Sequence, residues 1–179
     1  MFMQPQIPGR LVRIAPTQLS DYDALYAVAR DPLIWEQHPA KDRWKPDVFK
    51  PFFEAGLKSA GALTIRDAAT DEVIGSSRYY WLNTDERHVS IGYTYLARRC
   101  WGGTYNHELK RLMLVNAFTE VDRVWFHIGS NNIRSRRAIE AIGAALDKEI
   151  IDDPAWNAVS MAYYFIDKNS RFLNERLVG

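Results

Sequence analysis

The spacing of apolar residues in the first part of the chain predicts one strand followed by two helices. Residues 10–16, RLVRIAP, have the pattern of a strand that ends at a proline. Residues 20–32 predict a helix that Ser20 caps, and residues 46–61 predict a second helix. Residues 1–9 carry no periodic pattern, so we expect a loose lead-in there.

The middle of the chain changes to the two-residue period of β-strands. Residues 62–83 contain two apolar runs around the polar turn DAATDE, which predicts a hairpin. Residues 88–97 alternate, and the alternation predicts one strand face formed by Val89, Ile91, Tyr93 and Tyr95.

The remaining elements alternate helix and strand and then end in a hairpin. We predict a helix over 106–121, a strand over 124–129, a helix over 135–144, strands over 146–151 and 158–167, and a short last helix within 170–177. The order β-α-α-β-β-β-α-β-α-β-β mixes hairpins with βα crossovers. It predicts an α/β (α+β) fold with a mixed sheet flanked by helices. A chain of 179 residues without internal repeats suits a single domain, residues 1–179.

The composition argues against several classes of protein. Aromatic residues make up 13% of the chain, which argues against disorder, and a net charge of +1 gives no reason to expect a nucleic acid or a membrane as partner. Cys100 is the single cysteine, so no internal disulfide can form. No apolar run near the start has the length of a signal peptide or a membrane span, and we expect a soluble, cytoplasmic protein.

Residues 98–106, RRCWGGTYN, join a predicted strand to a predicted helix and combine positive charge with two glycines. The start of a helix presents unpaired N–H groups and the positive end of its dipole, which together suit a phosphate group. Gly102 and Gly103 allow a ligand to approach the main chain closely, and Thr104 adds a hydroxyl donor. The alternative is a plain tight turn with solvated arginines. The loop matches neither G-x-x-x-x-G-K-[ST] nor G-x-G-x-x-G, so ordinary nucleotide-binding loops are disfavoured.

Two segments together resemble the GNAT superfamily of acyl-CoA-dependent N-acetyltransferases. They are IGYTYLARRCWGGTYNHELKRLML, residues 91–114, and NNIRSRRAIEAIGA, residues 131–144. More narrowly, the chain is similar to the branch of ribosomal-protein N-terminal (alanine/serine) acetyltransferases, and the resemblance covers most of its length.

The resemblance rests on two motifs. The family's phosphate loop, [QR]-x-x-G-x-[GA], falls on Arg99, Gly102 and Thr104. Its second signature, N-x-x-S before a short helix that ends in glycine, falls on Asn132 and Ser135. Thr104 departs from the usual Gly or Ala, and we interpret the change as an altered phosphate contact.

The resemblance implies a mostly antiparallel central sheet in which one pair of strands splays apart and holds acyl-CoA. The implied cofactor is acetyl-CoA, and a backbone N–H near residues 92–95 would polarise the carbonyl of its thioester. The implied cofactor contacts are Leu96, Ala97, Arg98, Arg99, Trp101, Gly102, Gly103, Thr104, Tyr105, Asn106, Asn132 and Ser135.

Candidate residues for proton transfer are fewer. Many family members use a tyrosine as the acid at the position of Ile139, and Ser135 matches the serine used instead in the N-terminal acetyltransferase branch. Ser135 could equally be the N-cap of the helix that follows. His88 is the candidate general base, because an imidazole titrates near neutral pH, although a surface histidine is the ordinary alternative. Asp152 and Asp153 could also act, but their position favours turn residues.

The candidate acceptor-binding residues are Trp35, His38 and Trp81, with Trp44 nearby. The resemblance places the segment between the first two helices at the acceptor groove, where aromatic walls would suit a peptide or an extended amine. Core packing is the alternative, and it is the ordinary role of His127 as well. No His, Cys and carboxylate residues have metal-ligand spacing, so we expect no metal.

These features predict an acetyl-CoA-dependent N-acetyltransferase whose acceptor is a primary amine, either a protein N-terminus or a small amine, that attacks directly. Cys100 has no evident base partner, so no covalent acyl-enzyme is expected. A non-catalytic acyl-CoA-binding protein is the alternative, because Ser90 stands where related sequences often carry Glu. A nucleic-acid-binding module is a third hypothesis, which the near-neutral charge opposes. We expect a monomer or a homodimer.

Overall fold

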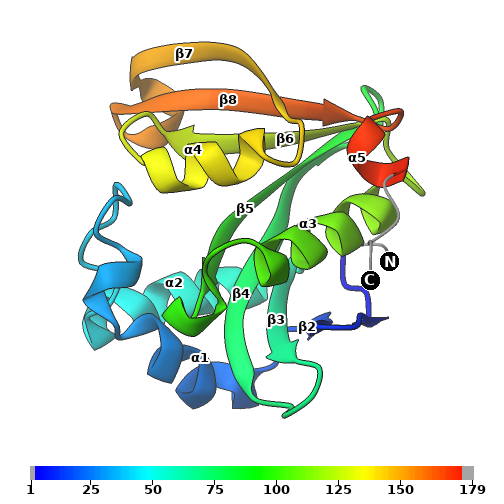
Figure 1. Ribbon diagram of the computed structural model, residues 1–179. Coiled ribbons are helices and arrows are strands. Elements are labelled where there is room, and N and C mark those ends of the chain that lie inside the picture. The colour runs from blue at the N-terminus through cyan, green and yellow to red at the C-terminus, as the bar shows by residue number, and fades with distance from the viewer. Residues whose placement is uncertain (1–2, 175–179) are drawn as a thin grey trace.

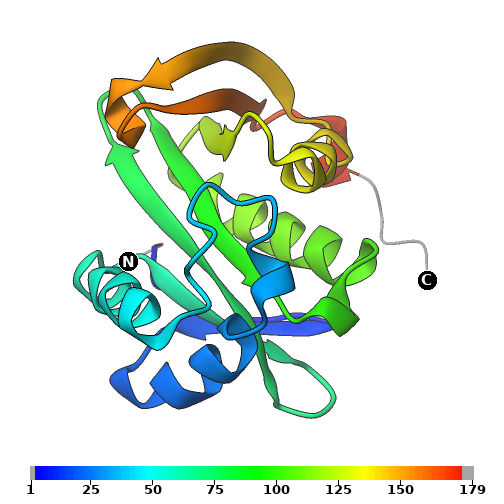
Figure 2. The same ribbon diagram turned by 90° about the vertical axis from the view of Figure 1, so that its left-hand side faces the viewer.

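The computed structural model describes residues 3–174, and its centre is one eight-stranded sheet (Figures 1 and 2). The strand order is β1-β2-β3-β4-β5-β6-β8-β7, and every neighbouring pair is antiparallel except β5 with β6. This confirms the predicted mixed, mostly antiparallel sheet. The strands are β1 (Ile7–Pro8), β2 (Val12–Pro16), β3 (Ala62–Asp67), β4 (Val73–Asn83), β5 (His88–Leu96), β6 (Arg123–Gly129), β7 (Ala145–Asp153) and β8 (Val159–Asp167).

Helices cover both faces of the sheet, as Figure 2 shows from the side. One face carries α1 (Tyr22–Ala29) and α2 (Pro46–Lys58), and the other carries α3 (Thr104–Ala117), α4 (Ile133–Glu140) and α5 (Arg171–Asn174). Four short 3₁₀ turns join them: η1 (Leu19–Asp21), η2 (Pro32–Ile34), η3 (Arg98–Cys100) and η4 (Pro154–Trp156). The predicted last helix is therefore present as α5, while residues 175–177 lie outside the described residues.

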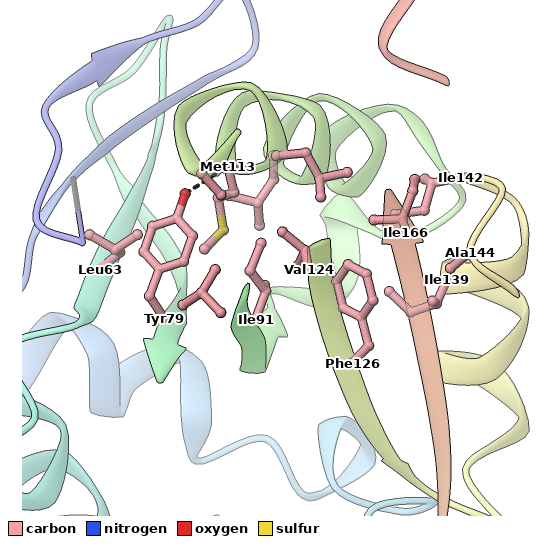
Figure 3. Packing of buried hydrophobic residues seen from close by; sticks show 14 of the residues in the cluster. Leu63, Tyr79, Ile91, Met113, Val124, Phe126, Ile139, Ile142, Ala144 and Ile166 are labelled. Atoms are coloured by element: carbon pink, nitrogen blue, oxygen red, sulfur yellow. Dashed lines mark hydrogen bonds between the residues drawn. The ribbon is translucent and has the colours of Figure 1, made fainter. Parts of the chain in front are cut away.

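Each face of the sheet has its own hydrophobic cluster. Figure 3 shows the larger cluster, in which α3 covers the strands and the Tyr79 hydroxyl donates a hydrogen bond of 2.6 Å to the Met113 carbonyl. Full burial of a large apolar side chain stabilises the fold by about 1.5–3 kcal/mol, so both clusters contribute heavily. The smaller cluster joins α1 and α2 to the sheet through Leu25, Ala29, Ile34, Trp35, Phe49, Phe53, Val73 and Tyr95.

A β-bulge at Tyr93 overturns the predicted alternation of β5. Between Gly92 and Tyr95, β5 takes three steps where β4 takes two, and Tyr93 has a φ of +53°. The extra residue inverts the side chains that follow it. Val89 and Ile91 accordingly lie in the cluster under α3, whereas Tyr95 lies in the cluster on the opposite face.

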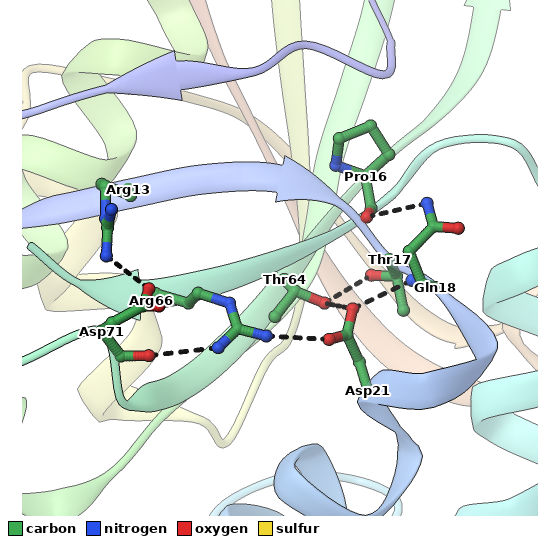
Figure 4. Close-up of polar contacts among 8 residues, drawn as sticks. All are labelled: Arg13, Pro16, Thr17, Gln18, Asp21, Thr64, Arg66 and Asp71. Atoms are coloured by element: carbon green, nitrogen blue, oxygen red, sulfur yellow. Dashed lines mark hydrogen bonds and ion pairs between the residues drawn. The ribbon is translucent and has the colours of Figure 1, made fainter.

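Asp21, and not Ser20, organises the start of α1 (Figure 4). The carboxylate of Asp21 accepts hydrogen bonds from the Gln18 N–H at 2.9 Å, from Thr64 Oγ1 at 2.9 Å and from Arg66 Nη2 at 3.0 Å. The predicted cap is wrong because the chain begins to turn one residue earlier, as η1. The same carboxylate ties α1 to β3.

Part of the predicted loose lead-in is a strand, since β1 pairs with β2. The chain just beyond it is bonded to α3 through Glu108, which is buried at 3% exposure. The Glu108 carboxylate accepts the backbone N–H groups of Arg10, Leu11 and Val12 at 3.0, 2.6 and 2.8 Å. A charged acceptor for three N–H groups holds this edge of the sheet against the helix.

Candidate functional site

A cleft of about 1230 Å³ opens where β5 and β6 separate. The two strands pair only over residues 88–90 and 123–125, and beyond that point they diverge toward the left of Figure 1. The later part of β5 therefore has main-chain groups without a partner strand on this side. The volume exceeds the roughly 300–1,000 Å³ of ordinary ligand pockets. It leaves room for a large cofactor together with a second substrate.

The loop before α3 forms one end of the cleft. Gly102 and Gly103 have φ values of +95° and +126°, which favour glycine, and a Cβ on either would meet no atom within 4 Å. Both residues line the cleft, so a ligand has room to lie against their main chain. The helix begins at Thr104, earlier than the predicted start near Asn106. Its free N–H groups are thus those of Thr104, Tyr105 and Asn106, which suits a phosphate.

The two arginines of this loop point away from the cleft. Arg98 pairs with Asp31, while Arg99 pairs with Asp67 at 3.3 Å and with Glu72 at 2.6 Å. Neither residue lines the cleft. Their guanidinium groups brace the loop against β3 and the segment after α1.

Two arginines that the sequence analysis did not select supply charge in their place. Arg134 and Arg137 of α4 both line the cleft. The Arg134 guanidinium lies 4.1 Å from the centre of the Trp101 ring and donates a hydrogen bond of 2.7 Å to the Ile34 carbonyl. It therefore bridges the cleft between the glycine loop and η2. The run RSRR, residues 134–137, was the available signal, but only the register of α4 shows which of its arginines face inward.

Asn132 begins α4. Its Oδ1 accepts a hydrogen bond of 3.2 Å from the Ser135 N–H, so Asn132 is the N-cap and Ser135 is the third helical residue. The alternative that Ser135 caps this helix is wrong. Ser135 lines the cleft, and its hydroxyl has no hydrogen-bond partner among residues 3–174. That hydroxyl is available to a ligand.

Trp35 and His38 also line the cleft. Trp35 is also a core residue at 2% exposure, and its Nε1 donates to the Ala29 carbonyl at 2.7 Å. His38 Nδ1 accepts the Ala40 N–H at 2.9 Å. Burial, together with the charge of Arg43, lowers the pKa of His38 to about 3, so this imidazole is neutral at pH 7.

Trp81 does not line the cleft, but it supports an aromatic wall that does. A second bulge, with a φ of +51° at Trp81, turns its ring toward Tyr80, Trp156 and His127 at centre-to-centre distances of 5.2, 5.2 and 5.1 Å. The Tyr80 hydroxyl lies 2.8 Å from His127 Nδ1, and burial lowers the pKa of His127 to about 4. Trp44 packs against the smaller core cluster and stays outside the cleft.

None of the predicted bases lines the cleft. His88 lies at the far end of β5, where the strands still pair, and its Nε2 contacts Glu86 Oε2 at 3.0 Å. Asp153 accepts the Tyr163 hydroxyl at 2.6 Å and caps η4, in agreement with the turn interpretation. Asp152 lies on the exposed edge of the same hairpin. His88 is therefore remote from the cleft.

The cleft is positively charged and lacks a free carboxylate. Among the described residues that line it, Glu108 is the single acidic one, and its oxygens already accept three backbone N–H groups. The Cys100 thiol also lines it, and burial raises the pKa of this group, which does not favour a thiolate nucleophile. The basic residues that line it are Arg10, Arg43, Lys110, Arg134 and Arg137.

The predicted cofactor contacts divide into two groups. Those that line the cleft are Leu96, Trp101, Gly102, Gly103, Thr104, Asn106, Asn132 and Ser135, and those that do not are Ala97, Arg98, Arg99 and Tyr105. Tyr105 is turned toward β3, where its hydroxyl donates to Asp67 at 2.9 Å. Between residues 3 and 174 no group of His, Cys, Asp and Glu could hold a metal ion, and no helix is long and apolar enough to cross a membrane.

Known proteins share this architecture. The fold is similar to a GCN5-related N-acetyltransferase from Brucella melitensis, at 18% identity over 92% of this chain and 79% of that chain, with a TM-score of 0.81. It is also similar to a GNAT-family acetyltransferase from Bacillus anthracis, at 17% identity over 91% and 98% of the two chains, with a TM-score of 0.73. The spermidine N-acetyltransferase of Vibrio cholerae, solved with CoA and spermine, is 14% identical over 92% and 99%, with a TM-score of 0.68. No curated protein matches the chain.

At these identities the solved structures support the fold alone, and the sequence supplies the assignment. Residues 11–145 match the family described as the acetyltransferase (GNAT) domain, and this stretch contains the glycine loop, both splayed strands and α4. The chain therefore belongs to the GNAT acetyltransferase family.

Proposed function

We propose that this protein transfers an acetyl group from acetyl-CoA to a primary amine, which attacks directly while both substrates are bound. The observation that carries the proposal is the single cleft that joins the glycine loop, through the splay of β5 and β6, to an aromatic second end. The thioester of acetyl-CoA supplies the activated acetyl group. Gly102, Gly103 and the start of α3 would hold the diphosphate, and the open space beside both glycines fits a group of that size.

The bulge of β5 provides the donor for the acyl carbonyl. Tyr93 and Thr94 lie between the last paired positions with β4, and β6 has already diverged from β5 at this point. We assign the polarising N–H to this pair, where a comparable donor contributes about 3–4 kcal/mol to the transition state. Ser135, whose hydroxyl is free in the cleft, is the proposed proton donor to the departing thiolate.

Two of the imidazoles that line the cleft, those of His38 and His127, are poor bases at neutral pH. Burial makes both His38 and His127 weak bases, and Glu108 is fully engaged. The amine would therefore arrive in its neutral form, or lose its proton to water or to Lys110, whose pKa burial lowers to about 7. We expect kcat/KM to rise with pH toward the pKa of the acceptor amine itself.

The test is release of CoA thiol from acetyl-CoA against a panel of small amines and N-terminal peptides, with mass spectrometry of the products. We expect acetylation of at least one acceptor, with one thiol released for each acetyl group transferred. Peptide N-termini belong in the panel because the two motifs resemble the ribosomal-protein branch. Tight binding of acetyl-CoA without turnover of any acceptor would establish the alternative, a non-catalytic acyl-CoA-binding protein.

A further inference from the structure

Two guanidinium groups flank one phenyl ring at the acceptor end of the cleft. Arg43, from the segment between η2 and α2, has its Cζ 4.2 Å from the centre of the Phe52 ring, and Arg78 of β4 has its Cζ 5.3 Å from the same centre. Arg78 also lies 4.4 Å from the centre of the Tyr93 ring at the bulge. Arg43 lines the cleft, and Arg78 lies outside the lining, at 8% exposure. Positive charge is thus concentrated beside the bulge, where we place the acyl carbonyl.

Neither guanidinium is neutralised by the part of the chain that the structure describes. Arg78 Nη2 donates to the Phe52 carbonyl at 3.3 Å, and its buried Nε has no partner. Arg43 has one polar contact, at 3.4 Å from Nη1 to His38 Nε2. Because His38 Nδ1 accepts the Ala40 N–H, the ring proton lies on Nε2, and this contact joins two donors. Burial, with repulsion from Arg78, lowers the pKa of Arg43 to about 10.

Other arginines of the chain do find a carboxylate. Arg66 pairs with Asp21, Arg99 with Asp67 and Arg136 with Glu149. Two neighbouring guanidinium groups without an anion, one buried and one half-buried, are costly to the fold. Such an arrangement is most easily understood if a ligand supplies the missing anion.

The diphosphate of CoA does not account for this charge, because it has donors of its own. The glycine loop, the start of α3, Arg134 and Arg137 serve that end of the cleft. Arg43 instead packs on two rings, with its Cζ 4.2 Å from the centre of the Phe52 ring and 5.1 Å from the centre of the Trp35 ring. The unmatched charge therefore belongs with the acceptor.

We propose that the acceptor is an amine that carries a carboxylate, as an apolar amino acid does, and that Arg43 binds this carboxylate while Arg78 adds positive charge behind it. This inference rests on the proposed function. A guanidinium presents two parallel N–H donors that match a carboxylate, and the rings of Trp35, Tyr80 and Tyr93 offer apolar surface for the rest of the molecule. A polyamine is positively charged, as the two guanidinium groups are, and would be repelled by them.

The experiment compares L-phenylalanine, its amide, phenethylamine and spermidine as acceptors for the wild type, Arg43→Gln and Arg43→Lys. Arg30→Gln, an exposed change at the end of α1, is the matched control. We expect Arg43→Gln to raise KM for phenylalanine at least tenfold more than KM for the amide. Since the same two acceptors are compared in each variant, the different pKa values of their amines cancel. Arg43→Lys keeps the charge and loses the paired donors, so part of the discrimination should return.

Calorimetry supplies a readout that does not depend on turnover. In the presence of CoA, the wild type should bind N-acetyl-L-phenylalanine, the product anion, and Arg43→Gln should bind it at least tenfold more weakly. Preferred turnover of spermidine, or an equal effect of Arg43→Gln on all acceptors, would overturn the carboxylate assignment. Neither result would contradict the proposed acetyltransferase activity. If the folded protein binds CoA but acetylates none of the four amines and no member of the wider panel, the proposed function itself fails.

Discussion

Lys110 of α3 donates a hydrogen bond of 2.6 Å from Nζ to Thr94 Oγ1 on β5, directly after the bulge. Thr94 Oγ1 lies 2.8 Å from Ser77 Oγ, and the lysine nitrogen lies 6.0 Å from the centre of the Phe126 ring on β6. No carboxylate of residues 3–174 pairs with this amine, which is 3% exposed. Burial disfavours the charged form and lowers the pKa of Lys110 from 10.5 to about 7.

The stability of the fold should therefore depend on pH through Lys110. Between pH 7 and 10 the unfolded chain holds a proton on this amine that the folded chain has lost. The free energy of unfolding then rises with pH, by up to about 1.4 kcal/mol per unit. Urea unfolding of Lys110→Met at pH 7, 8 and 9 should lack this rise, while the exposed Lys50→Met keeps it. Equal slopes in wild type and Lys110→Met would show that the amine is not perturbed.

Gly102 should control the affinity for CoA. A side chain at this position enters open space beside the start of α3, so Gly102→Glu places a negative charge where we expect the diphosphate. We expect the Kd for CoA to rise at least tenfold, measured by calorimetry. Gly102→Ala is the matched control, because it carries the same backbone strain, about 1–2 kcal/mol, with only a methyl group in the cleft. An unchanged Kd in the glutamate variant would remove the phosphate site from this loop.

Asn132 and Ser135 should separate stability from catalysis. Asn132→Ala removes the N-cap of α4 and should lower the free energy of unfolding by about 1 kcal/mol. Ser135→Ala removes a hydroxyl that bonds nothing in the described chain, so its free energy of unfolding should change by less than about 0.5 kcal/mol. Its kcat should nevertheless fall by about 10²-fold, because the departing thiolate loses its proton donor. Wild-type kcat in the serine variant would reject this role.

Both motifs lie at the start of a helix beside the cleft, but only some of their side chains face it. Gly102 has the positive φ that the sequence predicts for this loop, whereas Asn132 caps α4 in place of the Ser135 that the sequence offered as a cap. Arg99 matches the phosphate-loop motif equally well, yet it faces Asp67, a residue of β3 far away along the chain. A motif carries no information on such a partner.

The bulge of β5 likewise depends on a partner strand that the local sequence does not reveal. The segment IGYTY continues the two-residue period through Tyr93, and nothing in its composition marks an extra residue. The pairing of β5 with β4 leaves one extra residue in β5. As a result Tyr95 lies on the other face of the sheet, and the ring of Tyr93 lies against Arg78. The geometry of the acceptor end depends on this one extra residue.

The amino-acid sequence by itself determined the order of helices and strands and the position of the glycine loop, because periodicity and the turn preference of glycine are properties of neighbouring residues. Only the tertiary structure decided which basic side chains in and beside the cleft have no carboxylate partner. Arg43, Arg78 and Lys110 come from three separate elements, and whether each finds a carboxylate depends on what the fold brings beside it. Ion pairing and burial are long-range properties, so no local pattern could have assigned them.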